Sequence, residues 1–183
     1  ENCDGYAYDP ENPSQHIIDM SENEIEVPED YTREELRQDL LCYTSPVLKE
    51  DLVLTGDMTA ELYISSDAPD TDFVVRVTDV DENGRSIKLA DGLLSARYRN
   101  GFARSEFLQE GEIVCLKIRT TKLSNCFRKG HRIRVTVTSS AKNFIFPNSN
   151  TREGFASART VVAHNRVYHG GVHASRLTVR VEP

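Results

Sequence analysis

The sequence predicts an all-β fold, an antiparallel sandwich of the jelly-roll type. Apolar and polar residues alternate with a period of two in several separate segments after residue 52, as in strands that bury one face. Glycine-containing pairs that favour turns separate these segments, namely Asn83-Gly84, Asp91-Gly92, Glu110-Gly111, Lys129-Gly130 and Gly170-Gly171. Only one segment has a helical pattern, so about eight short strands in two sheets are expected.

Residues 1–31 are expected to form an irregular arm, and residues 32–183 the sandwich. The arm contains Pro10, Pro13 and Pro28 and shows little periodicity. Much of the net charge of −7 comes from acidic residues that crowd together here and just beyond, namely Asp19, Glu22, Glu24, Glu26, Glu29, Asp30, Glu34 and Glu35. The chain begins at Glu1 without an initiator methionine, which is typical of a piece cut from a longer protein.

One short helix is predicted over residues 31–41, in the segment YTREELRQDLL. Thr32 and Glu35 have the spacing of a capping box, in which each side chain bonds a free backbone N–H of the first turn. Leu36, Leu40 and Leu41 would then form one apolar stripe.

The strand predicted around residues 58–65 has two distinct faces. Met58, Ala60, Leu62 and Ile64 share one face, and Thr59, Glu61, Tyr63 and Ser65 share the other. The same alternation returns in Phe73/Val75/Val77, Ile87/Leu89, Val114/Leu116/Ile118, Ile133/Val135/Val137 and Leu177/Val179/Val181. Leu62 is therefore expected in the core and Tyr63 on the outside.

Composition argues against several partners. The acidic balance lacks the basic face that nucleic acid requires, and no apolar run reaches the roughly 20 residues that span a bilayer. The four cysteines, Cys3, Cys42, Cys115 and Cys126, show no short spacing that predicts zinc. We expect reduced, mostly buried thiols in a cytoplasmic protein, with no metal and no cofactor.

The acidic stretch SSDAPDTDFVVRVTDVDENGRS, residues 65–86, is a candidate for a metal or catalytic site. Asp79, Asp81 and Asn83 match the first half of an EF-hand loop, but its twelfth position, which must be a bidentate Glu, is Ala90. A hairpin with Asn83-Gly84 at its turn is the better interpretation. Asp67, Asp70 and Asp72 are interpreted as loop and cap residues that bond backbone groups, rather than as an acid/base pair.

No catalytic group is predicted in this chain. The sequence contains no Gly-x-Ser-x-Gly elbow for a serine nucleophile. His164, His169 and His173 recur near the end without a fourth ligand at metal-site spacing, so polar loop histidines are the simpler interpretation. His131 is expected to be structural, with a hydrogen bond to a neighbouring loop.

Several phrases together are more specific than any one of them, namely YDPENP, RQDLLCYTSPVLKEDLVLTG, AELYISSDAPDTDFVVRVTDVDENGRSIKLADGLLSARYR, FRKGHRIRVTVTSSAKNFIFPNSNT and HASRLTVRV. Nearly the whole chain resembles the C-terminal domain of the X-Pro dipeptidyl-peptidase, cocaine esterase and α-amino-acid ester hydrolase family, the CocE/NonD serine hydrolases. The acidic segment at residues 19–35 departs from the glycine-rich connector expected there.

The resemblance implies a galactose-binding-like jelly roll that packs on an α/β-hydrolase domain of the same parent chain, with residues 1–31 as the linker. The parent would be a serine hydrolase of esters or of X-Pro dipeptides, and its Ser-Asp-His triad would lie outside this sequence. The resemblance also implies that Leu62 and Tyr63 contribute to the acyl side of the substrate pocket. A homodimer is left open.

Two other functions compete with this one. A carbohydrate-binding jelly roll would display aromatic platforms, and the chain has no tryptophan. An adhesion or scaffold domain would show a large apolar patch unrelated to a catalytic partner.

Overall fold

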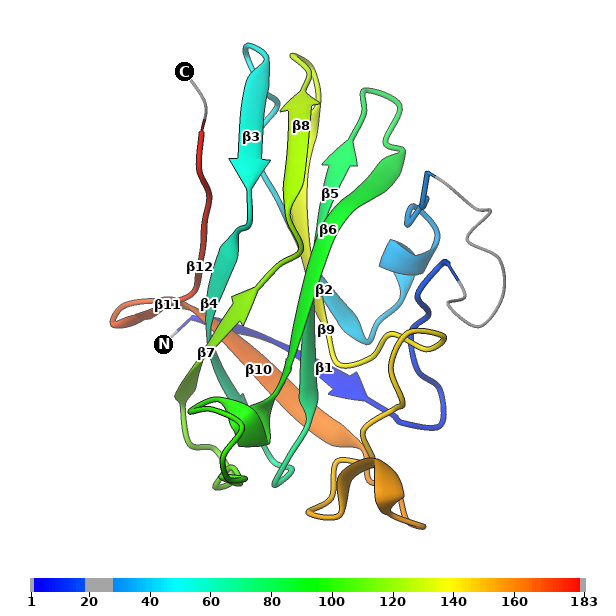
Figure 1. Cartoon of the computed structure of the whole chain (residues 1–183), viewed down its shortest axis with the longest axis vertical. Coiled ribbons are helices and arrows are strands. Elements are labelled where there is room, and N and C mark those ends of the chain that lie inside the picture. Colours follow the sequence, from blue (N-terminus) through cyan, green and yellow to red (C-terminus); the bar gives the residue numbers. More distant parts are fainter. Residues whose placement is uncertain (1, 19–27, 182–183) are drawn as a thin grey trace.

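The computed structural model describes residues 2–18 and 28–181 and shows an antiparallel β-sandwich (Figure 1). The strands are β1 (Cys3–Tyr8), β2 (Leu40–Thr44), β3 (Leu52–Gly56), β4 (Thr59–Ser66), β5 (Asp72–Val80), β6 (Ser86–Ser95), β7 (Val114–Arg119), β8 (Leu123–Phe127), β9 (Arg132–Thr138), β10 (Ala163–Gly170), β11 (His173–Ala174) and β12 (Arg176–Thr178). Three single 3₁₀ turns accompany them, η1 (Glu34–Leu36), η2 (Ala96–Tyr98) and η3 (Gly154–Ala156). The predicted all-β fold is confirmed. Across the two described ranges, no helix has the length and apolarity needed to cross a membrane.

Two sheets form the layers of the sandwich. In the large sheet, β4 pairs with β7 along one edge and with β10 and then β12 along the other, and β1 and β11 pair with β10. The small sheet has the order β2-β9-β5-β6. Strands β3 and β8 form a separate two-stranded ribbon, seen at the top of Figure 1.

The core lies between the inner faces of the two sheets. Its buried side chains come from alternate positions of the strands, as the period of two predicts. The large sheet contributes Leu62, Ile64, Leu116, Ile118 and Val167, and the small sheet contributes Phe73, Val75 and Val137.

The irregular arm expected over residues 1–31 is wrong in its first part, because Cys3–Tyr8 form strand β1. This strand pairs with β10 along its whole length, from Cys3 opposite Tyr168 to Tyr8 opposite Ala163. Tyr6 and Tyr8 point inward and join the core, so this short segment is held both by backbone pairing and by aromatic burial. The acidic residues Asp19, Glu22, Glu24 and Glu26 lie outside the described residues.

The helix predicted over residues 31–41 is also wrong, since only the 3₁₀ turn η1 forms and β2 begins at Leu40. The capping box does not form. Thr32 Oγ1 accepts the Ser86 backbone N–H at 2.9 Å, and Glu35 Oε1 accepts the Ser86 hydroxyl at 2.8 Å. Glu35 is buried against the small sheet while Leu36 is 75% exposed, so the sheet determines the conformation of this segment and the local helical pattern does not.

Four of the five predicted glycine turns are confirmed by positive φ, at Gly84, Gly111, Gly130 and Gly171. Asp91-Gly92 is not a turn, because both residues lie inside β6. A Cβ on Gly92 would meet the Arg119 carbonyl oxygen at 2.4 Å. This glycine therefore allows the end of β7 to approach β6 closely.

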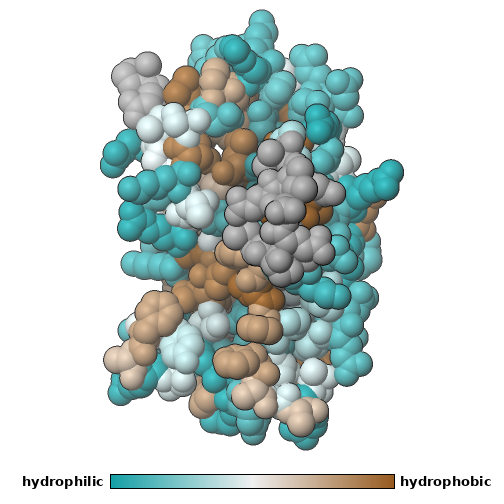
Figure 2. Space-filling model, turned by 45° about the vertical axis from the view of Figure 1, so that its right-hand side comes forward, coloured by the Kyte–Doolittle hydropathy of each residue, from teal (hydrophilic) through white to brown (hydrophobic). Residues whose placement is uncertain are grey.

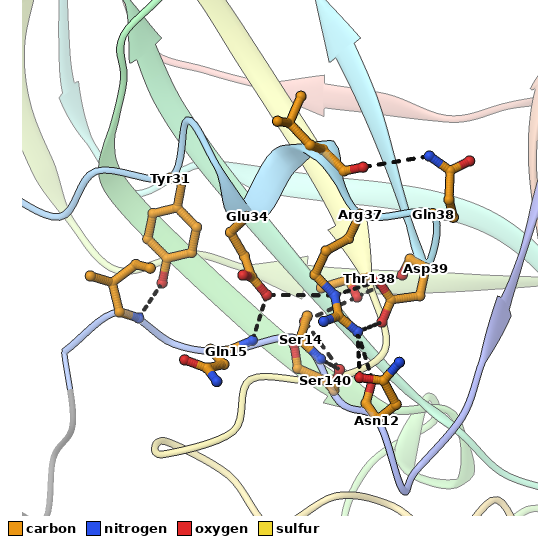
Figure 3. Close-up of polar contacts among 12 residues, drawn as sticks. Asn12, Ser14, Gln15, Tyr31, Glu34, Arg37, Gln38, Asp39, Thr138 and Ser140 are labelled. Carbon is orange, nitrogen blue, oxygen red and sulfur yellow. Dashed lines mark hydrogen bonds and ion pairs between the residues drawn. The ribbon is translucent and has the colours of Figure 1, made fainter.

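The outer face of the small sheet is covered by the remaining arm, through polar contacts (Figure 3). Ser14 donates its hydroxyl to the Ser140 carbonyl at 2.8 Å, and its own backbone N–H donates to Ser140 Oγ. Arg37 joins Asp39 to the Asn12 carbonyl. We call this interface the polar layer, and it comprises residues 12–18 and 28–37 with the strand side chains beneath them.

Charged side chains in the polar layer are mostly paired. Lys88 Nζ lies 2.8 Å from Glu29 and 2.9 Å from Asp91. His16 Nε2 lies 2.8 Å from Lys88 Nζ, and His16 Nδ1 is 2.8 Å from the Ile18 carbonyl oxygen. The arm is thus held on the sheet by ion pairs, which require opposite charges on the two partners.

Candidate functional site

Leu62 and Tyr63, the predicted pocket residues, are neighbours on β4 but face opposite sides of the large sheet. Leu62 is buried in the core, and Tyr63 is half-buried on the outer face. Successive side chains of a strand always diverge in this way. The structure therefore does not bring the two side chains onto one surface, and their contribution to a substrate pocket stays a prediction.

Tyr63 lies in a group of aromatic rings on the outer face of the large sheet. The ring of His173, at the start of β11, lies 5.2 Å from that of Tyr63 and 6.3 Å from that of Tyr168. Tyr168 is the partner of Tyr63 across the β4–β10 pair, and its hydroxyl bonds Ser65 Oγ at 3.0 Å. The Tyr63 backbone N–H donates to Ser175 Oγ at 2.9 Å. We call Tyr63, Tyr168 and His173 the Tyr63 cluster.

The chemistry around the Tyr63 cluster favours contact with apolar or aromatic groups. The nearest thiol in the register is that of Cys115, the partner of Tyr63 on β7. Burial and the carboxylate of Glu61 raise the pKa of Cys115, and a protonated thiol is a weak nucleophile. The cluster can therefore offer ring surfaces to a neighbour, but it does not offer an activated nucleophile.

A second surface feature is a set of exposed phenylalanines at one end of the sandwich. Phe102, Phe146 and Phe155 are between 77% and 81% exposed, and the rings of Phe146 and Phe155 stack with centroids 6.1 Å apart. In Figure 2, hydrophobic side chains gather over the lower part of this face. We call these three residues the phenylalanine end. Apolar rings clustered at such exposure are typical of a surface that another protein part covers.

Loops at the phenylalanine end are held by two buried carboxylates. Asp70 accepts the Arg97 Nε–H at 2.7 Å and the Asn148 amide at 2.7 Å, and the same amide donates to Asp72 at 2.9 Å. Burial raises the pKa of Asp72. Asp67 lies apart from them and pairs with His164 at 2.7 Å. As predicted, Asp67 and Asp70 bond backbone groups, since they accept the N–H of His164 at 2.8 Å and of Arg97 at 2.9 Å. Asp70 and Asp72 are in addition buried and anchor a side-chain network between loops.

The partial EF-hand forms a hairpin turn, as predicted. Asp81 Oδ1 accepts the backbone N–H groups of Asn83 and Arg85 at 2.8 and 2.9 Å. His131 Nδ1 lies 2.9 Å from Asp79, so its partner is on strand β5 rather than in a loop. In the part of the chain that the structure describes, no three His, Cys, Asp or Glu side chains are grouped to hold a metal ion.

The histidines near the end lie in strands rather than in loops. His164 and His169 are on β10 and His173 is on β11. His169 Nε2 lies 3.2 Å from Asp4 on the neighbouring strand. All four cysteines are free thiols that are half-buried or exposed, so the prediction of mostly buried thiols is wrong.

Sequence reasoning missed the phenylalanine end and two members of the Tyr63 cluster. Two of its members, Phe146 and Phe155, follow β9 in a segment without strand alternation. Aromatic residues among Asn, Pro and Ser were the available signal, since a loop has no core in which to bury them. Tyr168 and His173 become neighbours only through the β10–β4 pairing and the β10–β11 hairpin.

Comparison with known proteins agrees with the sequence resemblance. Residues 3–178 match the family described as X-Pro dipeptidyl-peptidase C-terminal non-catalytic domain. Cocaine esterase from Rhodococcus sp. (strain MB1 Bresler) is 35% identical over 188 residues, which cover 99% of this chain and 32% of that protein.

Solved structures share the fold. An aminopeptidase from the marine sediment archaeon Thaumarchaeota archaeon matches with a TM-score of 0.89 at 24% identity, over 100% of this chain and 33% of that one. An α-amino acid ester hydrolase matches with a TM-score of 0.88 at 22% identity, with the same coverage. The chain spans about a third of the length of these relatives. It belongs to the family of X-Pro dipeptidyl-peptidase C-terminal non-catalytic domains.

Proposed function

We propose that this chain is the accessory sandwich of a CocE/NonD-type serine hydrolase, which cleaves esters or X-Pro dipeptides with a triad in another domain. Family membership over residues 3–178 is the observation that carries the proposal. The span of about a third of each relative supports a larger parent protein. The role of the sandwich is to pack on the hydrolase domain and to help shape its substrate pocket.

Activity measurements test this division of roles. The 183-residue chain is expected to leave p-nitrophenyl acetate, p-nitrophenyl butyrate and Ala-Pro-p-nitroanilide intact. A longer protein that contains the chain should hydrolyse at least one of them. Hydrolysis by the isolated chain, with a specific activity that rises as the chain is purified, would overturn the proposal.

Within this function, Tyr63 contacts the acyl side of the substrate and Leu62 holds its strand in place. The half-buried ring of Tyr63 and the neighbouring His173 ring, 5.2 Å away, support an apolar contact surface. Leu62 supports the contact indirectly, since its side chain anchors β4 in the core.

Substrate preference of the longer protein tests the role of Tyr63. Tyr63→Ala should change the ratio of kcat/KM between butyrate and acetate esters about tenfold, because one ring contact with an acyl group is lost. Tyr63→Phe should retain most of the preference, since it keeps the ring. Leu36→Ala, at an exposed position on the opposite layer, is the control. An unchanged ratio in Tyr63→Ala would remove this residue from the pocket.

The phenylalanine end is the surface that we propose packs against the hydrolase domain. Replacing Phe146 and Phe155 by serine should lower the Tm of the longer protein and leave the Tm of the isolated chain unchanged, because both rings are already exposed in the chain alone. An equal effect on both proteins would contradict docking. A concentration-dependent dimer of the isolated chain that the same changes abolish would assign this surface to a second copy.

A further inference from the structure

An unfilled pocket lies between the two sheets, among strands β2, β4, β9, β10 and β12. Its volume is about 130 Å³. The large sheet lines it with Ala60, Leu62, Val167 and Leu177, and the small sheet with Val135 and Val137. Tyr43, His169, Ser175 and Arg176 complete the lining.

The pocket exists because short side chains face one another across the sandwich. Ala60 and the three valines are shorter than the leucine and phenylalanine side chains that fill the rest of the core. Protein interiors rarely leave room for more than a water molecule. A volume of this size has space for water, but water needs two or more polar partners, and the aliphatic part of the wall offers none.

One polar atom of the lining, Tyr43 Oη, is poorly satisfied. It is buried and makes no hydrogen bond of ordinary geometry within the described ranges, and the Asp4 carboxylate is the charged acceptor that acts on it. Burial and the charge of the nearby Asp4 carboxylate raise the pKa of Tyr43, so the hydroxyl keeps its proton and can donate it. A buried donor without a well-formed hydrogen bond is unusual in a folded protein and is costly.

Charged groups surround the exposed side of the pocket. The ring of His169 meets that of Tyr43 edge-on at 6.5 Å, and His169 Nε2 lies 3.2 Å from Asp4. Arg176 pairs with Glu61. The arrangement, an apolar interior with one convergent donor and a charged rim, is typical of a small-molecule site.

We propose that this pocket binds a small, uncharged, monocyclic aromatic molecule that carries one hydrogen-bond acceptor. The ring fills the space between Leu62, Val137 and Val167, and the acceptor accepts a hydrogen bond from Tyr43 Oη–H. A carboxylate in the same place would face the Asp4 charge, and Arg176 in the lining is already paired with Glu61, so a neutral ligand is favoured over an anion. The site is separate from the Tyr63 cluster, because Leu62 and Tyr63 face opposite sides of β4, and the proposal does not depend on the proposed hydrolase role.

Binding of benzyl alcohol, toluene and benzoate to the 183-residue chain, followed by amide NMR shifts, tests the site. Benzyl alcohol should give saturable shifts in β4, β9 and β10, and benzoate none. Tyr43→Phe should weaken the binding of benzyl alcohol about three- to tenfold, which corresponds to the loss of one hydrogen bond. The binding of toluene should not change.

A filled pocket provides the second test. Ala60→Val should abolish the shifts with both neutral probes, and Val135→Ile should do the same if the first variant does not fold. Absence of saturable shifts with benzyl alcohol and toluene would overturn the proposal, as would unchanged binding in a folded pocket-filling variant. Equal binding of benzoate, or an equal loss of toluene in Tyr43→Phe, would overturn the assignment of a neutral ligand bound through Tyr43 Oη.

Discussion

The two faces of the small sheet bury side chains of opposite kinds. On β5, Phe73, Val75 and Val77 face the large sheet and lie in the apolar core. Arg76 and Thr78, each next to Val77 in the strand, face the polar layer and are also buried. Burial alone therefore does not distinguish the two faces, but the interactions that compensate for burial do.

The difference teaches that one sheet can be stabilised by two unlike mechanisms. The inner face depends on the removal of apolar surface from water, which is non-directional and insensitive to pH. The outer face depends on paired charges and hydrogen bonds, which require correct geometry and protonation. Substitutions on the two faces should therefore change the free energy of unfolding by different amounts, and these changes should depend on pH differently.

The largest effect is expected on the inner face, for Phe73→Ala. The ring is fully buried, so its removal should lower the free energy of unfolding by about 3–5 kcal/mol. Val74→Ala, one residue further on the same strand and also buried, should cost about 1–2 kcal/mol. Urea unfolding monitored by circular dichroism measures both. Equal losses of unfolding free energy in the two variants would show that the inner face of β5 contributes no more to stability than the outer face.

The next largest effect is expected for Glu35 in the polar layer. Its carboxylate binds Arg134 and the hydroxyl of Ser86, so Glu35→Ala leaves a partly buried arginine unpaired and should cost about 3 kcal/mol. Leu36→Ala, in the same 3₁₀ turn but exposed, should stay within about 0.5 kcal/mol of the unmodified chain. A larger loss of unfolding free energy in Leu36→Ala than in Glu35→Ala would show that Leu36 is the buried residue, as the predicted helix requires.

This pair of residues shows why the sequence predicted some elements and missed others. Strands with one buried apolar face, such as β4 and β9, follow the period of two and were recognised. Glu35 and Leu36 were misread because an apolar stripe is normally buried, and here the buried partners are Arg134 and Ser86, 99 and 51 residues away. Contacts of that range leave no local signal.

The candidate sites follow the same rule. The alternation of residues predicts that Leu62 and Tyr63 point to opposite faces of the sheet, since this depends only on strand geometry. The companions of Tyr63, namely Tyr168 and His173, depend on which strands pair, and the pocket beside Leu62 depends on the lengths of side chains from both sheets. Neither can be read from a single segment.

Acid should weaken the polar layer before the core, through Asp91. Burial would raise the pKa of Asp91, but contacts with His16 and Lys88 outweigh it and lower the pKa to about 2, from 3.8. A carboxyl with a lowered pKa in the folded state stabilises the fold above about pH 4, and this contribution, about 2 kcal/mol, is lost as the pH falls toward 2. Unfolding free energies between pH 7 and pH 2 should therefore fall less steeply in Asp91→Asn. An identical slope would assign the acid sensitivity to other carboxylates.

Arg76 gives the sharpest comparison of the two faces, because its replacement by methionine is expected to change the free energy of unfolding little. Its side chain is 1% exposed, and no carboxylate of residues 2–18 or 28–181 lies within ion-pair distance of it. Its Nη2 reaches the Ser140 carbonyl at 3.2 Å, the guanidinium lies 4.8 Å from the centre of the Tyr31 ring, and Nε has no partner.

Among the described residues, this buried charge contacts carbonyl groups and an aromatic ring, and a charge held in this way is replaceable by an apolar side chain of similar length. Arg76→Met should therefore leave the free energy of unfolding within about 1 kcal/mol of the unmodified chain or raise it. Arg76→Ala should lower it by about 2 kcal/mol, because it opens a cavity under Tyr31. If Arg76→Met instead costs as much as Arg76→Ala, the charge itself orders the arm, and the polar layer depends on its ions even where they lack partners of opposite sign.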